Sequence, residues 1–111
     1  MTISKNDNEI WWVYSTFRNR EEAFSVATKL LEQKLIACAN LLENVTSLYH
    51  WEGTLHQETE CVMLTKTSAA ARDLAIQAIT DLHSYELPCV VALPLSAGSP
   101  PFFRWVKTQT A

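Results

Sequence analysis

The run of strand-forming residues from Ala37 to Thr67 constrains this chain more than any other feature. Between Val45 and Trp51 the side chains alternate between two faces, which is the periodicity of a strand. Glu52-Gly53 supplies a turn, because glycine adopts positive φ without a Cβ clash. A second strand rich in valine and threonine follows. The pattern predicts one long β-hairpin.

The arms of this hairpin are longer than a compact domain requires. Arms of roughly 13 residues at about 3.3 Å per residue span about 40 Å, whereas a compact domain of this chain length has a diameter of roughly 35 Å. The hairpin therefore overhangs its own domain, and the apolar side chains near its end need cover: Tyr49, Trp51 and Leu55. Another copy of the same chain is the simplest cover.

The rest of the chain alternates strand and helix signals. The apolar run over residues 9–17 predicts a strand buried on both faces or nearly so, with Trp11 and Trp12 on opposite faces. Three residues of types that commonly cap helices precede helical patterns. Asn19 precedes a helix over about residues 20–34, Ser68 precedes one that runs to about residue 82, and Ser99 precedes a short last helix. Phe102, Trp105 and Val106 line one side of that last helix. Residues 89–93 predict a short fourth strand.

The order of elements is strand, helix, strand, strand, helix, strand, with an appended helix. This order predicts an α+β fold, the ferredoxin-like βαββαβ sandwich, in which both helices lie on one face of an antiparallel sheet. By length, residues 1–111 form a single domain, and residues 1–8 are expected to fray. The sheet face without helices predicts a partner.

Composition removes several classes of function. The net charge is −3 without a cluster of lysine and arginine, so nucleic acid is not an expected partner. No apolar run approaches the about 20 residues of a membrane helix, and the polar start lacks the apolar core of a signal peptide. Cys38, Cys61 and Cys89 have no CxxC spacing, which predicts reduced thiols and a cytoplasmic protein.

The sequence predicts a protein that is not an enzyme. A Gly-rich phosphate loop and a GxSxG motif are both absent. Cys38 and Cys61 lie in apolar strands, as inert buried thiols do. His50 and His56 flank the hairpin turn. If the turn has three residues, the two histidines face each other; if it has two, they are out of register.

Two groups of residues are candidates for a binding site. His83 and Cys89 bracket a Tyr-Glu-Leu-Pro turn, and an imidazole with a thiolate suits Cu(I) or Zn(II). In the alternative interpretation, His83 caps the end of a helix and Cys89 is a small core residue.

The second group lies on the predicted hairpin and the same turn. Glu58 and Glu60 share a strand face with Lys66, which is either a solvated face or the polar wall of a cleft at a subunit boundary. The candidate cleft residues are Glu60, Lys66, Tyr85 and Trp51.

Several motifs, in order along the chain, resemble the CutA divalent-cation tolerance family. They are Lys34-Leu35-Ile36-Ala37-Cys38-Ala39-Asn40, Ser47-Leu48-Tyr49-His50-Trp51-Glu52-Gly53, Lys66-Thr67, His83-Ser84-Tyr85-Glu86-Leu87-Pro88, and Leu93-Pro94-Leu95 with Trp105. The likeness runs from about Glu9 to Val106. It implies a ferredoxin-like subunit in a tight homotrimer whose long hairpins pair with neighbouring subunits, similar to the PII signalling proteins. It also implies a link to copper and other divalent cations.

The resemblance further implies three positions for metal ligands. They are a cysteine on the first strand, the histidine of a His-Pro-Tyr-Glu motif, and an acidic residue after the following proline. This sequence has Ser15 at the first position and Cys89 at the third, and its motif reads His83-Ser84-Tyr85-Glu86. Ser15 removes a soft ligand and Cys89 adds one.

Together with the family resemblance, these patterns predict a cytoplasmic homotrimer that binds a metal ion or a small ligand in clefts between subunits. Copper or another divalent cation is the candidate metal. The alternative is a structural, scaffolding or signalling trimer without a physiological metal. An enzyme that uses Lys66, Glu60 and His83 is a third hypothesis, but three polar residues do not define a catalytic site.

Overall fold

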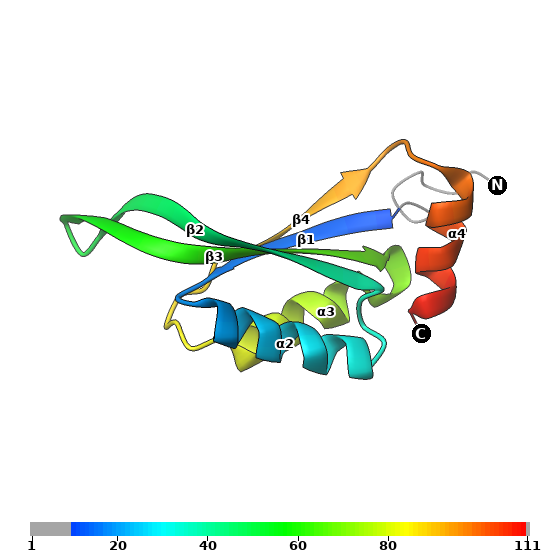
Figure 1. Cartoon of the computed structure of the whole chain (residues 1–111), viewed down its shortest axis with the longest axis horizontal. Coiled ribbons are helices and arrows are strands. Elements are labelled where there is room, and N and C mark those ends of the chain that lie inside the picture. Colours follow the sequence, from blue (N-terminus) through cyan, green and yellow to red (C-terminus); the bar gives the residue numbers. More distant parts are fainter. Residues whose placement is uncertain (1–9, 111) are drawn as a thin grey trace.

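The computed structural model describes residues 10–110 (Figure 1). Its elements are β1 (Ile10–Phe17), α2 (Arg20–Glu32), β2 (Cys38–Trp51), β3 (Thr54–Ser68), α3 (Ala69–Leu82), β4 (Val90–Leu95) and α4 (Pro100–Gln109). This order confirms the βαββαβ prediction with its C-terminal helix. Residues 1–8, which were expected to fray, lie outside the described residues.

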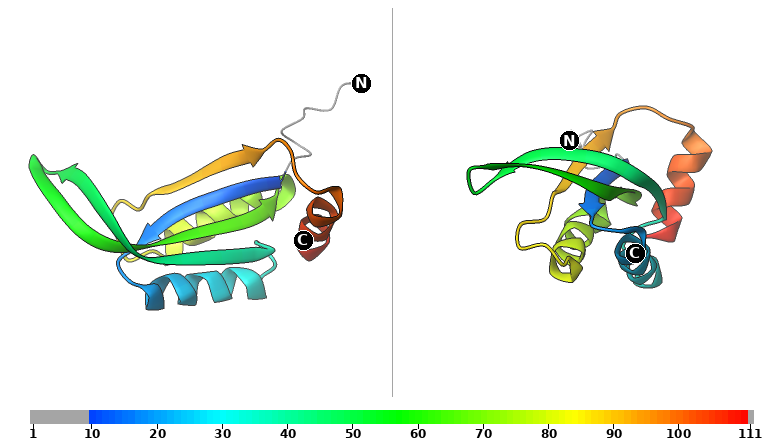
Figure 2. Two further views of the ribbon diagram at one scale, coloured as in Figure 1. Left: turned by 45° about the horizontal axis from the view of Figure 1, so that its top comes forward. Right: turned by 60° about the vertical axis from the view of Figure 1, so that its left-hand side comes forward.

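The four strands form one sheet in the order β2-β3-β1-β4, and every neighbouring pair is antiparallel. Helices α2 and α3 lie side by side on one face of this sheet, and α4 lies across one end of it (Figures 1 and 2). The α+β ferredoxin-like prediction is therefore confirmed. We call the sheet face opposite α2 and α3 the open face.

The main core lies between the sheet and the two helices. Alternate strand residues point toward the helices because successive side chains of a strand point to opposite faces. The buried apolar residues of this core include Val13, Phe17, Met63, Leu30 and Ile79. A second, smaller cluster packs Val106 of α4 against Ile10 and Ala37.

The open face of β1 is less buried than the sequence predicted. Val13, Ser15 and Phe17 face the helices and are fully buried, but Trp12 and Tyr14 on the open face are half-buried. On the neighbouring strand β4, the open-face residues Val91 and Leu93 are 51% and 53% exposed. The difference arises because, within residues 10–110, α2 and α3 cover only the other face of the sheet.

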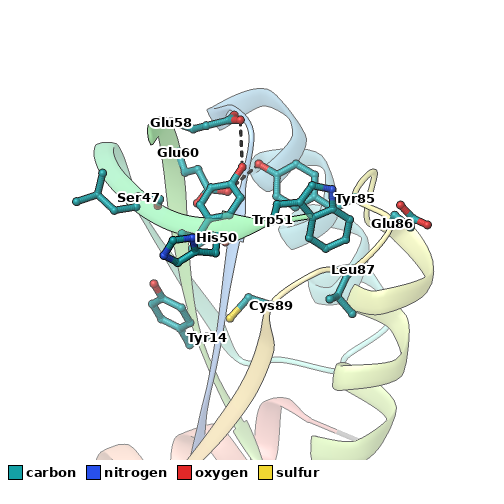
Figure 3. A pocket seen from close by; sticks show the side chains of 13 residues that line it. Tyr14, Ser47, His50, Trp51, Glu58, Glu60, Tyr85, Glu86, Leu87 and Cys89 are labelled. Carbon is teal, nitrogen blue, oxygen red and sulfur yellow. Dashed lines mark hydrogen bonds between the residues drawn. The ribbon is translucent and has the colours of Figure 1, made fainter. Parts of the chain in front are cut away.

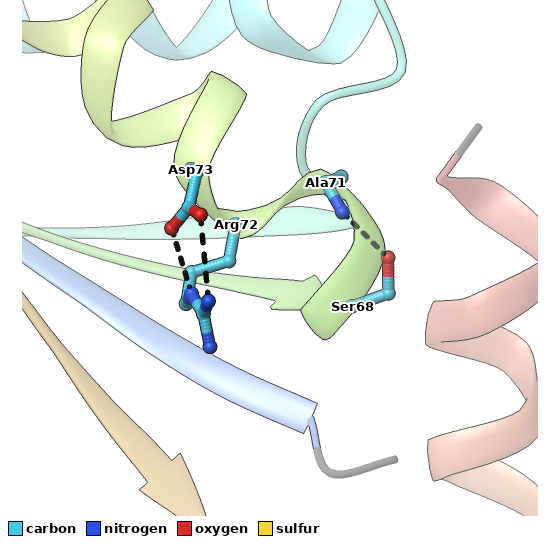
Figure 4. A network of polar contacts seen from close by, with 4 residues as sticks. All are labelled: Ser68, Ala71, Arg72 and Asp73. Atoms are coloured by element: carbon cyan, nitrogen blue, oxygen red, sulfur yellow. Dashed lines mark hydrogen bonds and ion pairs between the residues drawn. The ribbon is translucent and has the colours of Figure 1, made fainter. Parts of the chain in front are cut away.

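Two of the three predicted helix caps are formed. The Asn19 side chain accepts a hydrogen bond from the backbone N–H of Glu22 at 2.9 Å. The Ser68 hydroxyl accepts one from the N–H of Ala71 at 3.3 Å (Figure 4). Ser99 precedes α4 as predicted, but its side chain makes no cap hydrogen bond within the described part of the chain. Each formed cap satisfies one of the free N–H groups at a helix start.

Three element boundaries and one packing prediction differ from the sequence analysis. Helix α2 ends at Glu32 instead of about residue 34, because Lys34 adopts a left-handed conformation with φ of 59°. Strand β4 begins at Val90 and continues to Leu95, since pairing with β1 runs that far. In α4 only Val106 is buried, whereas Phe102 and Trp105 stay partly exposed.

The hairpin formed by β2 and β3 is long, with strands of 14 and 15 residues. It extends beyond the rest of the chain on the left of Figure 1, and the molecule measures 50 × 28 × 24 Å. A bulge between Leu42 and Val45, where Asn44 has a φ of 60°, interrupts the pairing. Near the far end, Leu55 is 66% exposed and Trp51 is 36% exposed. The predicted overhang and its apolar end are both present.

A two-residue turn closes the hairpin. Glu52 and Gly53 both have positive φ, 51° and 79°, and Trp51 pairs with Thr54. Positive φ at both central residues is the geometry of a type I′ turn. His56 therefore pairs with Tyr49 instead of His50, and its ring stacks on that of Tyr49 with centroids 5.3 Å apart. The facing of His50 and His56 that required a three-residue loop is not formed.

The turn makes a prediction about stability. A Cβ at Gly53 meets no atom within 4 Å, so Gly53→Ala tests the backbone conformation alone. We expect it to lower the free energy of unfolding by about 1–2 kcal/mol, the cost of a left-handed conformation for a residue with a Cβ. Glu52→Asn is the opposite change, because asparagine tolerates positive φ better than glutamate, and it should raise the urea midpoint at equal protein concentration. Equal midpoints for both variants and the unmodified chain would contradict this account of the turn.

Candidate functional site

A cleft of about 590 Å³ lies on the open face, where the hairpin leaves the sheet (Figure 3). Four parts of the chain form its walls: β1, β2, β3 and the segment between α3 and β4. The lining residues are Tyr14, Thr16, Ser47, Leu48, Tyr49, His50, Trp51, Glu58, Glu60, Tyr85, Glu86, Leu87 and Cys89. Clefts of this volume suit small organic ligands.

Two glutamates of β3 each accept a hydrogen bond from a tyrosine (Figure 3). The Tyr85 hydroxyl donates to Glu60 Oε2 at 2.7 Å, and the Tyr49 hydroxyl donates to Glu58 Oε1 at 3.0 Å. Glu58 and Glu60 are two residues apart on one strand, so both point to the open face. Glu60 is only 8% exposed. A buried carboxylate with one neutral donor is costly unless a cation or further donors complete its environment.

His83 holds the turn that carries Tyr85. Its Nδ1 accepts the backbone N–H of Tyr85 at 3.1 Å, which assigns the proton to Nε2, and Nε2–H donates to the carbonyl of Thr16 at 2.7 Å. The ring stacks on Phe17 with centroids 4.3 Å apart. The backbone N–H of His83 also bonds to the carbonyl of Thr80 at the end of α3. Both ring nitrogens are therefore used in this conformation.

Cys89 lies in the cleft wall, and its thiol is not activated. Desolvation in the wall, and to a lesser extent the charge of Glu60, raises the pKa of Cys89 above its usual value. A raised pKa keeps the sulfur protonated at neutral pH, whereas a metal binds the thiolate. Within residues 10–110, no group of three or more histidine, cysteine, aspartate or glutamate residues is arranged to hold a metal ion. The soft donor pair predicted from the sequence does not form a complete site in one chain.

The cleft carries negative charge. Glu58, Glu60 and Glu86 line it, and no lysine or arginine of the described residues does. Burial raises the pKa of Tyr85 strongly, and the hydrogen bond to Glu60 and the charge of Glu60 raise it further. Burial and the charges of Cys89 and Glu60 raise the pKa of Tyr14 in the same direction. This environment disfavours anions and favours a cation.

The cleft brings together Trp51, Glu60, Tyr85 and Cys89 from the sequence candidates. Lys66 does not line it. Its ammonium instead donates to Asn40 Oδ1 at 3.1 Å and lies 5.9 Å from the ring centroid of Trp12. Lys66 lies six positions along the extended strand from Glu60, about 20 Å away. The two side chains therefore share a strand face but not the cleft.

Ser15 points away from the cleft. It is fully buried on the helix-facing side of β1, and its hydroxyl oxygen has no hydrogen-bond partner among residues 10–110. Tyr14, Tyr49 and Leu87 line the cleft but were not identified as site residues from the sequence. Tyr14 had a usable signal, because it alternates with Ser15 and so belongs to the open face of the predicted first strand.

These features define a ferredoxin-like protein with an elongated hairpin and an acidic cleft at its base. Residues 11–109 match the family model described as CutA1 divalent ion tolerance protein. The chain belongs to the CutA1 family, as the sequence motifs predicted. Within the described range, no helix has the length and apolar character needed to cross a membrane.

Named relatives and solved structures agree with this assignment. Protein CutA homolog of Xenopus laevis is 36% identical over 93 residues, which are 84% of this chain and 62% of that protein. Divalent-cation tolerance protein CutA of Salmonella newport is 37% identical over 97 residues, 87% of this chain and 84% of that protein. The crystal structure of divalent ion tolerance protein CutA1 from Ehrlichia chaffeensis has a TM-score of 0.89 and 36% identity, covering 94% of this chain and 97% of that chain.

The chain is shorter than some of these relatives. It spans between 54% and 62% of the length of the frog, mouse, human, Arabidopsis and rice proteins. It spans 97% to 99% of the solved chains from Ehrlichia chaffeensis and Thermus thermophilus. The shared part is the ferredoxin-like unit.

The Tyr85–Glu60 hydrogen bond makes a prediction about pH. At neutral pH, Tyr85→Phe should lower the free energy of unfolding by about 1.5–3 kcal/mol, the range for a hydrogen bond to a charged group. The folded-state pKa of Tyr85 is raised above the ordinary value of 10.0. Its stabilising contribution is therefore complete below pH 10 and is lost as the pH rises above that value, where the unfolded tyrosine ionises and the folded one does not.

We thus expect the stability difference between Tyr85→Phe and the unmodified chain to shrink between pH 9 and pH 11.5 in urea unfolding. Tyr49→Phe is the matched control, because Tyr49 makes the equivalent bond to Glu58 at a more exposed position. The stability difference between Tyr49→Phe and the unmodified chain should be smaller at every pH. A Tyr85→Phe difference that stays constant with pH would contradict the proposed role of this hydrogen bond.

Proposed function

We propose that this chain is a homotrimeric cation-binding protein that takes a divalent metal ion or a small ligand in clefts completed by neighbouring subunits. The observation that carries the proposal is the buried Glu60 carboxylate, which shares a cleft with Glu58 and has no lysine or arginine beside it among the described lining residues. Such a carboxylate favours a cation. The protein is a binding module, not an enzyme, in this proposal.

Assembly accounts for the surfaces that one chain leaves uncovered. The apolar end of the hairpin and the open-face residues Val91 and Leu93 are exposed in the single chain. Exposed apolar patches of this kind mark contact surfaces. Three copies follow from the resemblance to the CutA family, in which long hairpins pair with neighbouring subunits. A neighbour at the hairpin also lies next to the cleft, since Ser47 to Trp51 belong to both.

Copper or another divalent cation is the proposed metal, and oxygen donors are its proposed ligands. The bacterial relatives from Citrobacter koseri and Salmonella newport are named divalent-cation tolerance proteins. Carboxylates suit hard cations, and within residues 10–110 the tyrosine hydroxyl groups bond to only one oxygen of Glu58 and one oxygen of Glu60. Cys89 is a further proposed donor. His83 can bind the metal only if one of the two hydrogen bonds of its ring nitrogens breaks.

A structural, scaffolding or signalling trimer without a physiological metal is the second candidate. The engaged nitrogens of His83 favour it, because the histidine implied as a metal ligand has a structural use here. In either case we place the protein in the cytoplasm, a reducing compartment that suits its free cysteines Cys38, Cys61 and Cys89.

Calorimetric titration of the reduced protein with Zn²⁺ tests the carboxylate site, and titration with Cu⁺, which prefers thiolate and imidazole ligands, tests Cys89 and His83. We expect Glu60→Gln to weaken binding about tenfold or more, because it removes the buried charge while keeping an acceptor for Tyr85. Glu32→Gln is the matched control, since Glu32 is exposed at the end of α2. The same samples should sediment with about three times the 12.6 kDa of one chain.

Three outcomes are informative. A monomer at micromolar concentration would rule out the trimer. Unchanged binding in Cys89→Ser and His83→Ala would remove these two residues from the ligand set and leave the glutamates. Unchanged binding in Glu60→Gln would contradict the proposed cation site.

A further inference from the structure

We propose that the physiological ligand of the cleft is an organic cation, a small molecule with an ammonium group on a compact apolar body. The inference rests on the proposed function, since it names the class of cation that the same cleft takes. The volume of the cleft, the placement of its carboxylates and the aromatic side chains of its walls support this class of ligand.

The placement of the carboxylates suits an ammonium group better than a bare metal ion. Glu58 and Glu60 are two positions apart on β3, about 6.6 Å along the strand. Each already accepts a tyrosine O–H at one oxygen. A divalent metal needs several donors converging at about 2.0–2.6 Å, and residues 10–110 offer no such group of three. An ammonium group needs only acceptors at hydrogen-bond distance, and the second oxygen of Glu60 is such an acceptor.

The walls of the cleft suit the apolar part of such a ligand. Trp51, Tyr14, Leu87 and Tyr85 line the same cleft as the glutamates and come from three different segments; Trp51 and Tyr85 lie beside Glu58 and Glu60, and Tyr14 and Leu87 lie on the opposite side (Figure 3). Aromatic faces attract ammonium groups through their quadrupole, and tryptophan does so best. A cleft of about 590 Å³ is also far larger than one metal ion needs, and it lies within the range of small-molecule sites.

The charge of the cleft excludes the other common ligand classes. Its titratable lining groups are Glu58, Glu60, Glu86, His50, Cys89 and three tyrosines, and no lysine or arginine of residues 10–110 lines it. Nucleotides, phosphates and carboxylates need basic groups or free N–H donors to replace their hydration. The hydroxyl groups of Tyr49 and Tyr85 already donate to the glutamates. A ligand with donors and a positive charge fits this set of acceptors.

Calorimetry with three matched probes tests the inference on the assembled 111-residue protein. The probes are benzylamine, benzyl alcohol and benzoate, which share one ring and differ in charge. We expect benzylamine to bind at least about tenfold more tightly than benzyl alcohol, and benzoate not to bind. Glu60→Gln should remove the preference for the amine, because its amide carries no charge. Trp51→Leu should weaken the amine more than the alcohol, because leucine offers no cation–π contact.

Two controls keep the result interpretable. Glu32→Gln should bind benzylamine as the unmodified chain does, and sedimentation should show that Glu60→Gln and Trp51→Leu assemble as it does. Trp51 lies near the end of the hairpin, where a substitution could disturb assembly. If Trp51→Leu does not assemble, Trp51→Phe is used in its place. Phenylalanine keeps an aromatic ring, so this variant should retain most of the affinity for benzylamine.

The outcomes separate this inference from the proposed function. Zn²⁺ binding that depends on Glu60, without any benzylamine binding, would overturn the inference and leave the cation site in place. Equal binding of benzylamine and benzyl alcohol, or amine binding that survives Glu60→Gln, would also overturn the inference. Failure of both Zn²⁺ and benzylamine to bind would overturn both proposals.

Discussion

The antiparallel pairing of β2 with β3, closed by a two-residue turn, is the constraint on which the rest of the structure depends. The register runs from Cys38 opposite Lys66 to Trp51 opposite Thr54. Pairing with β1, from Ile10 opposite Ser68 to Phe17 opposite Cys61, fixes the faces of β3. Because side chains alternate along a strand, a slip of β2 by one residue against β3 would therefore exchange the two faces of β2. Tyr49 and Trp51 would then turn away from the open face, and the hydrogen bond from Tyr49 to Glu58 would be lost. The turn chemistry of Glu52-Gly53 therefore determines which residues form the site.

The sequence predicted the elements well where the signal is local. Asn19 and Ser68 cap helices through contacts within three residues, and the alternation from Val45 to Trp51 needs only the period of a strand. The predictions were weaker where one residue redirects the chain. The left-handed conformations of Lys34 and Asn44 end α2 early and interrupt the hairpin, and neither residue type signals this as strongly as glycine does.

The site was predictable in composition but not in geometry. Trp51, Glu60, Tyr85 and Cys89 lie around one cleft, yet the hydrogen bond that joins Tyr85 to Glu60 crosses 25 residues of sequence. Lys66 shows how far strand alternation can predict a site. Alternation correctly puts Lys66 on the same face as Glu60, but its distance along the strand puts it outside the cleft, where it bonds to Asn40. His83 illustrates another, since its ring holds the Tyr85 turn against β1 through two hydrogen bonds that no local pattern reveals. Its contribution to the site is to position Tyr85.

In the proposed trimer, assembly and binding use the same hairpin. An isolated two-stranded hairpin is at best marginally stable in water, and the outer part of this one, about residues 45–59, projects beyond the sheet (Figure 2). Hydrogen–deuterium exchange of these amides at micromolar protein concentration tests the central claim most directly. If neighbouring subunits cover the outer hairpin, its hydrogen-bonded amides should exchange about as slowly as those of β1. Exchange of these amides within seconds, while those of β1 stay protected, would contradict the account.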